Sequence, residues 1–312
     1  MVLSKFIGST IFFMKTPQPL HPGDKIGIIA PARKISMEEL TPALEIIYKQ
    51  GFEPVLGENI FKEEYQFAGS DKLRAFDFQN MLDNPEIKAV ISARGGYGSV
   101  RIVDNIDFSF FEKAPKWLVG YSDFTVFLNH VTKNFKTQTL HATMPVNFAD
   151  NTTESLTRLF DILKGEKTRY LFKAKNIFRE GKVTAKLVGG NLSVLYSLLN
   201  SISFPETDGN ILFLEDLDEY LYHIDRMIMA LKRSGKLKNL AGLVVGAMTD
   251  MHDNTVPFGK TAEEIIYDAV SEYDYPVITG FNAGHITNNL PLIIGSNSIL
   301  EVENGTGTLK FF

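Results

Sequence analysis

The sequence predicts an α/β protein whose N-terminal half forms a parallel sheet with helices on both faces. Three observations predict it: short β-branched apolar runs, amphipathic segments between them, and capping or turn residues at the junctions. The first run, residues 25–30, is closed by Pro31. Ser36 follows, and Glu39 three residues later completes the capping-box pattern of a helix that Gly51 would end.

The same strand-then-helix order continues along the first half of the chain. Residues 52–56, 87–92 and 117–121 have the short apolar pattern of buried strands. Residues 70–82 have the pattern of a helix, and another helix is expected to begin at Ser122. Strands that alternate with helices favour a parallel sheet.

The length of 312 residues suggests about two domains or one large one, and we expect two. Residues 14–164 are expected to form the N-terminal α/β domain, and the polar, basic segment 165–182 a linker. Residues 183–312 are expected to form a smaller β/α domain. Residues 1–13 are interpreted as an extension or a misplaced start. In the C-terminal domain we expect strands at 183–187, 211–214, 243–246, 277–279 and 299–302, and helices at 191–199, 221–232 and 261–271.

The composition narrows the possible chemistry. The chain has no cysteine, which excludes disulfides, thiolate metal sites, iron–sulfur clusters and a cysteine nucleophile. Its net charge of −5 argues against a nucleic-acid partner, and no apolar run approaches the ~20 residues that span a membrane. The six histidines show no convincing metal-ligand spacing. We therefore expect a cytoplasmic protein without a metal or other cofactor.

Ser122 is the strongest candidate for a nucleophile. It lies in the segment Gly-Tyr-Ser-Asp, where a buried strand ends and a helix is expected to begin. Such a turn can present a serine hydroxyl, while the N–H of Asp123 and the helix N-terminus stabilise an oxyanion. The match to G-x-S-x-G is incomplete because Phe124 holds the last position. The alternative is that Ser122 only caps the helix.

A glycine-rich loop follows the strand at 87–92. Arg94, Gly95, Gly96 and Gly98 lie within five positions, so the backbone could approach a ligand and present free N–H groups. An oxyanion or carboxylate site is the functional interpretation, and a tight turn is the alternative. The G-x-G-x-x-G dinucleotide spacing is not met.

An acid and a histidine in the second half could complete a catalytic set. Glu215 directly follows the apolar run 211–214. A partly desolvated carboxylate at the end of a buried strand is well placed to orient a histidine. The alternative is an acidic helix start. His285 follows Gly284 in a polar loop, where catalytic residues concentrate. His141, at the end of another strand, is its best competitor.

Together, Ser122, Glu215 and His285 predict acyl transfer by a hydroxyl nucleophile. His285 would take the proton of Ser122, and Glu215 would fix the imidazole tautomer. The backbone N–H groups of Gly96 and Asp123 would hold the oxyanion.

Five motifs in order resemble the LD-carboxypeptidases of serine peptidase family S66, over residues from about 23 to 309. The motifs lie at residues 94–98, 120–123, 187–192, 214–216 with 224–227, and 284–285. The resemblance implies a glutamine-amidotransferase-like N-terminal domain, a swivelling C-terminal domain, an active site in the cleft between them, and a homodimer. It also maps the nucleophile, acid and base onto Ser122, Glu215 and His285.

The implied reaction is hydrolysis of the amide between an L-centre and the terminal D-alanine of a peptidoglycan tetrapeptide, during recycling in the cytoplasm. Arg94 and the glycine loop would then lie near the substrate carboxylate. Family members tend to have His-Gly-Pro where this chain has Ala142 after His141, which puts substrate details in doubt. Two alternatives stay open. One is an immunity-type peptidase that cleaves aminoacyl or peptidyl nucleotides, and the other is a two-lobed small-ligand binding protein without catalysis.

Overall fold

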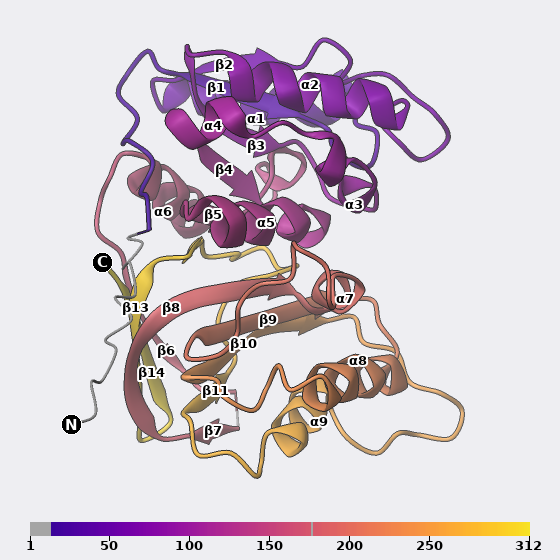
Figure 1. Ribbon diagram of the computed structural model, residues 1–312, viewed down its shortest axis with the longest axis vertical. Coiled ribbons are helices and arrows are strands. Elements are labelled where there is room, and N and C mark those ends of the chain that lie inside the picture. Colours follow the sequence, from indigo (N-terminus) through magenta and orange to yellow (C-terminus); the bar gives the residue numbers. More distant parts are fainter. Residues whose placement is uncertain (1–13, 176) are drawn as a thin grey trace, which may run out of the picture.

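The structure is a computed structural model that describes residues 14–175 and 177–312. It has two β-sheets with flanking helices, one above the other in Figure 1. The first sheet has the strand order β12-β5-β4-β3-β1-β2, and only β12 runs antiparallel to its neighbour. Its strands are β1 (Lys25–Ile29), β2 (Glu53–Leu56), β3 (Ile87–Ser92), β4 (Trp117–Gly120), β5 (Thr139–His141) and β12 (Leu292–Ile294).

Helices cover both faces of this sheet, which confirms the predicted fold class. The capping box is present: Ser36 Oγ accepts the Glu39 N–H at 3.2 Å, and Glu39 Oε2 accepts the Ser36 N–H at 2.8 Å. Helices α1 and α6 pack against one face of the sheet, and α2 and α5 against the other. The helices of this half are α1 (Met37–Lys49), α2 (Asp71–Asp83), α3 (Ser99–Ile102), α4 (Ser109–Lys113), α5 (Thr125–Phe135) and α6 (Thr153–Leu163).

The second sheet has the order β6-β14-β13-β8-β9-β10-β11-β7. The central strands β8 to β11 are parallel, and the outer pairs are antiparallel. Helices α7 (Leu192–Ser197), α8 (Leu221–Arg233) and α9 (Ala262–Ala269) pack on one face. The strands are β6 (Arg169–Lys173), β7 (Phe178–Arg179), β8 (Gly181–Asn191), β9 (Ile211–Leu217), β10 (Gly242–Thr249), β11 (Val277–Thr279), β13 (Asn297–Glu303) and β14 (Thr306–Phe311).

Two segments differ from the sequence-based expectation. The segment 165–182, expected to be a linker, carries β6 and β7, which are the two edge strands of the second sheet. Edge strands bury few side chains, so their apolar pattern is weak. Strand β12, in the C-terminal half, joins the first sheet beside β5, with Leu292 opposite His141. The C-terminal half therefore contributes to both sheets.

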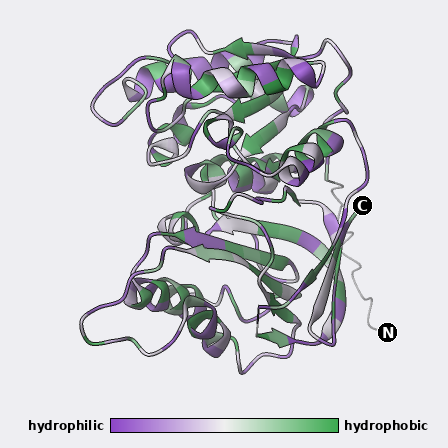
Figure 2. Ribbon diagram, turned by 180° about the vertical axis from the view of Figure 1, so that it is seen from behind, coloured by the Kyte–Doolittle hydropathy of each residue, from purple (hydrophilic) through white to green (hydrophobic). Residues whose placement is uncertain are grey.

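The two halves share buried apolar contacts. Val131 of α5 and Leu195 of α7 belong to one continuous cluster of buried side chains. Figure 2 shows apolar residues concentrated on the strands, and both polar and apolar residues along the helices. No helix in the described ranges has both the length and the apolar character needed to cross a membrane.

Candidate active site

Ser122 lies at a strained turn between β4 and α5. Its φ is 59°, in the left-handed region that costs a non-glycine residue of the order of 1 kcal/mol or more. The helix predicted to begin at Ser122 starts instead as a 3₁₀ turn, Ser122–Phe124, before α5. A Cβ on Gly120 would lie 2.7 Å from the Phe124 ring, so a glycine is needed there for the chain to turn so sharply. The turn places Ser122 on the wall of a cavity.

The glycine-rich loop after β3 lies directly against this serine. A Cβ on Gly95 would lie 2.9 Å from Ser122 Oγ, so the approach requires glycine. Gly96 has a φ of 116°, and within residues 14–175 and 177–312 its N–H donates to no protein acceptor. Asp123 has a second role that the sequence did not indicate: its buried carboxylate accepts the Ser99 N–H at 2.8 Å. Asp123 thus ties the end of the glycine loop to the turn that carries Ser122.

Glu215 and His285 form a hydrogen-bonded pair. Glu215 is fully buried in β9, and His285 lies in the loop after β11. His285 Nδ1 lies 2.8 Å from Glu215 Oε2. A Cβ on Gly284 would lie 2.7 Å from the same oxygen, so glycine allows the loop to approach the acid. With Nδ1 bound to Glu215, Nε2 is the imidazole nitrogen left for a substrate or a nucleophile.

Each member of the pair stabilises the charged form of the other. Burial disfavours the ionised carboxylate, but the positive charge of His285 and its hydrogen bond outweigh this effect and lower the pKa of Glu215. Burial likewise disfavours the imidazolium, but the charge of Glu215 and its hydrogen bond raise the pKa of His285. The neighbouring Asp216 is different, because burial and the charge of Glu215 raise its pKa to about 7.

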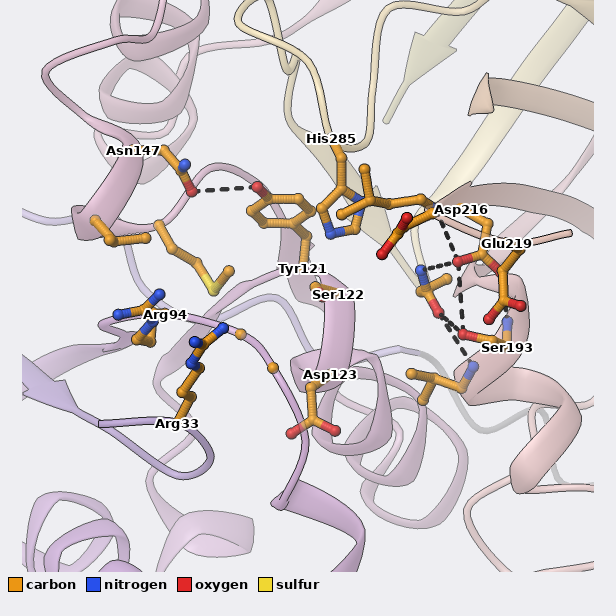
Figure 3. Close-up of a pocket in the computed structure, with 18 residues that line it drawn as sticks. Arg33, Arg94, Tyr121, Ser122, Asp123, Asn147, Ser193, Asp216, Glu219 and His285 are labelled. Atoms are coloured by element: carbon orange, nitrogen blue, oxygen red, sulfur yellow. Dashed lines mark hydrogen bonds between the residues drawn. The ribbon is translucent and has the colours of Figure 1, made fainter. Parts of the chain in front are cut away.

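A cavity of about 430 Å³ brings the candidate residues together (Figure 3). In this view Ser122 and His285 lie between Arg33 and Arg94 on one side and Asp216 and Glu219 on the other. Glu215 does not line the cavity and lies behind His285. In this structure no hydrogen bond joins Ser122 to His285; such contacts often tighten only with substrate bound. The predicted residues that line the cavity are Ser122, His285, Arg94, Gly95, Gly96 and Asp123.

Several cavity residues were missed in the sequence. Arg33 lies in the loop after β1, and its side chain makes no ion pair or hydrogen bond to the described residues. By contrast, Arg94 donates to the Lys34 carbonyl and to Glu39. The signal for Arg33 was its place just beyond the carboxyl end of a parallel strand, where ligand sites gather. Other residues that line the cavity, and that the sequence did not single out as site residues, are Tyr121, Asn147, Asn191, Asp216, Asp218 and Glu219.

Two carboxylates on the far side, Asp218 and Glu219, fit the alternative interpretation of an acidic helix start, because they precede α8. Both also line the cavity. Glu219 Oε2 lies 2.8 Å from His223 Nδ1, and Asp218 hydrogen-bonds His252. The cavity therefore has a cationic side and an anionic side, with Ser122 and His285 between them.

Comparisons with known proteins agree with this architecture. The family models described as the LD-carboxypeptidase N-terminal and C-terminal domains match residues 26–142 and 184–300. A Bacillus subtilis protein described as a probable murein peptide carboxypeptidase is 34% identical over an alignment of 304 residues, and the match covers 94% of each chain.

Solved structures show the same fold over nearly the whole chain. The muramoyltetrapeptide carboxypeptidase from Oxalobacter formigenes has a TM-score of 0.84 at 28% identity, covering 92% of this chain and 98% of that one. The structure of MccF in complex with glutamyl sulfamoyl guanosine has a TM-score of 0.85 at 21% identity, with 95% and 98% covered. This second likeness concerns the fold alone. On the family models and the Bacillus subtilis relative, the chain belongs to the LD-carboxypeptidase family, serine peptidase family S66.

Proposed function

We propose that this carboxypeptidase hydrolyses the amide bond between an L-centre and the terminal D-alanine of murein tetrapeptides, through Ser122, His285 and Glu215. The observation that carries the proposal is the cavity that a strained serine and a carboxylate-bound histidine both line. The descriptions of the relatives from Bacillus subtilis and Oxalobacter formigenes support the substrate class.

The proposed mechanism follows from the positions of these groups. His285 Nε2 takes the proton of the Ser122 hydroxyl as the oxygen attacks the scissile carbonyl. Glu215 holds Nδ1 and stabilises the imidazolium that forms. The N–H groups of Gly96 and Asp123 stabilise the oxyanion. His285 then protonates the leaving D-alanine amine, and water hydrolyses the acyl-enzyme.

The cationic side of the cavity is the proposed site of the terminal carboxylate. Arg33, with Arg94 and the glycine loop, would bind it and so select a chain end. We expect Arg33→Ala to raise KM for a tetrapeptide by ~10–100-fold, the value of one lost charge-assisted hydrogen bond, with little change in kcat. Lys34→Ala is the matched control, because Lys34 pairs with Glu63 at the surface. Steady-state kinetics measures KM for both variants. An equal increase in KM in both would contradict this role of Arg33.

The pH dependence should report the state of His285. We expect kcat/KM to fall toward acid with an inflection above ~6.5, the ordinary histidine pKa, because the base must be neutral and Glu215 raises its pKa. Glu215→Gln removes the negative charge and should move the inflection to lower pH. A profile that stays flat between about pH 5 and 8 would contradict the assignment of His285 as base.

The function is tested by incubating the purified protein with a murein tetrapeptide and following products by mass spectrometry. Conversion to the tripeptide and free D-alanine supports the proposal. Cleavage of an aminoacyl nucleotide without peptide cleavage would favour the immunity-type alternative, and tight binding without turnover would favour a binding protein. The immunity-type alternative would be favoured by an aromatic side chain near the site on which a nucleobase can stack. Tyr121, the tyrosine on the described cavity wall, is buried and packs 4.7 Å from His285, centroid to centroid.

The same proposal places the reaction in peptidoglycan recycling in the cytoplasm, and the protein in a homodimer. Both statements rest on the family resemblance. Size-exclusion chromatography with light scattering tests the second of them.

A further inference from the structure

His141 is a fully buried histidine that the proposed mechanism does not use. It ends β5, where its backbone pairs with Gly120 on one side and with Leu292 of β12 on the other. Its position is therefore fixed against the strand that leads into Ser122. Its ring packs edge-on to Phe213, with centroids 5.1 Å apart, and to Tyr121, with centroids 5.8 Å apart.

The ring of His141 faces the second oxygen of Glu215. Glu215 Oε2 is bound to His285, but Glu215 Oε1 has no hydrogen-bond partner in the described part of the chain. Both ring nitrogens of His141 also lack a partner among those residues. The two unsatisfied groups lie together, because His141 Nε2 is 3.8 Å from Glu215 Oε1.

Among the described residues, the other titratable groups near that oxygen have partners of their own. The groups that face Glu215 are His285, His141, Asp216 and the Tyr121 phenol. The Tyr121 hydroxyl donates to Asn147 at 3.2 Å, and Asp216 accepts from Asn191 at 2.9 Å. A buried carboxylate oxygen without a donor is costly, so a small approach of His141 would be favourable.

We propose that His141 is a positioning residue, whose Nε2–H donates to Glu215 Oε1 and so keeps Oε2 on His285 Nδ1. The proposal rests on the proposed triad. At 3.8 Å the contact is longer than a hydrogen bond, so the proposal requires a small approach of the His141 ring toward Glu215 in the folded protein. Without this donor the carboxylate is more basic and free to turn, so His285 is held less well and binds its proton more tightly.

The first test needs no substrate. In the full-length protein labelled with ¹⁵N-histidine, the imidazole nitrogen shifts report which nitrogen carries the proton. We expect neutral His141 to be protonated at Nε2. Protonation at Nδ1 alone would overturn the proposal. This measurement is independent of the substrate, so the role of His141 is tested even if the proposed peptide is not cleaved.

The second test compares His141→Phe, which keeps the ring volume, with His141→Gln, which restores an amide donor. Phe should raise the pKa of His285 in an NMR titration and lower kcat/KM by ~10–100-fold, as lost outer partners of a functional group do. KM should change little, and Gln should recover most of the rate. If Phe leaves both the titration and kcat unchanged, or Gln loses as much as Phe, the proposal is wrong.

A double-variant cycle identifies the residue through which His141 acts. In a Glu215→Ala background, His141→Phe should have almost no further effect on the pKa of His285 or on the residual rate, because the side chain through which His141 acts is gone. An undiminished loss in that background would show a packing role and overturn the proposal. If the wild-type protein does not cleave the peptide, the proposed function is contradicted. The histidine titrations, which need no substrate, would still test the role of His141.

Discussion

Ser122→Ala is expected to lower kcat/KM for tetrapeptide cleavage by at least ~10³–10⁴-fold while the protein stays folded. The hydroxyl is the only group removed, and Ser122 Oγ makes no hydrogen bond within the described residues, so the substitution breaks no hydrogen bond there. Release of D-alanine, measured by coupled assay or mass spectrometry, gives the rate. Circular dichroism checks the fold.

Ser122→Gly provides a sharper control than alanine. Glycine adopts a φ of 59° without strain, whereas serine and alanine do not. We therefore expect Ser122→Gly to have a free energy of unfolding about 1 kcal/mol above that of Ser122→Ala, with both inactive. The serine would then be kept at a cost in stability, as expected of a functional residue. Wild-type turnover by either variant would show that Ser122 is not the nucleophile.

Glu215→Gln is expected to lower kcat by ~10³–10⁴-fold, because a neutral amide can stabilise the wrong imidazole tautomer. Steady-state kinetics at neutral pH measures the loss. The Glu215 side chain is fully buried, and the substitution changes its 2.8 Å hydrogen bond with His285 Nδ1.

Glu301→Gln is the matched control for this change of charge. Glu301 forms a surface ion pair with Lys182 at 3.0 Å, which is worth little to stability. We expect that variant to keep wild-type kinetics. A Glu215→Gln enzyme within about tenfold of wild type would contradict the assignment of Glu215 as the acid.

Much of the first sheet could be predicted from the sequence, because local signals there agree. Strand β1 is a buried β-branched run, and the capping box at Ser36 and Glu39 is formed as expected. Strand β12 was missed because only three residues form it and its partner, β5, lies far away in the chain. Such pairing depends on tertiary contacts that local patterns do not contain.

The individual residues of the candidate site could be predicted from the sequence, but their arrangement in space could not. Ser122, Glu215 and His285 were each suggested by a position at a strand end or in an adjoining loop. The left-handed φ of Ser122 and the contact of His141 with Glu215 depend on how the two sheets come together. Arg33 gave only the weak signal of an exposed loop residue after a strand.

The measurement that tests the central claim most directly compares two tetrapeptides that differ only in the configuration of the last alanine. We expect the wild-type enzyme to release D-alanine from the L–D bond, with a kcat/KM at least ~100-fold higher than for release of L-alanine from the L–L bond. Equal rates for both peptides, or no release of D-alanine at all, would contradict the account.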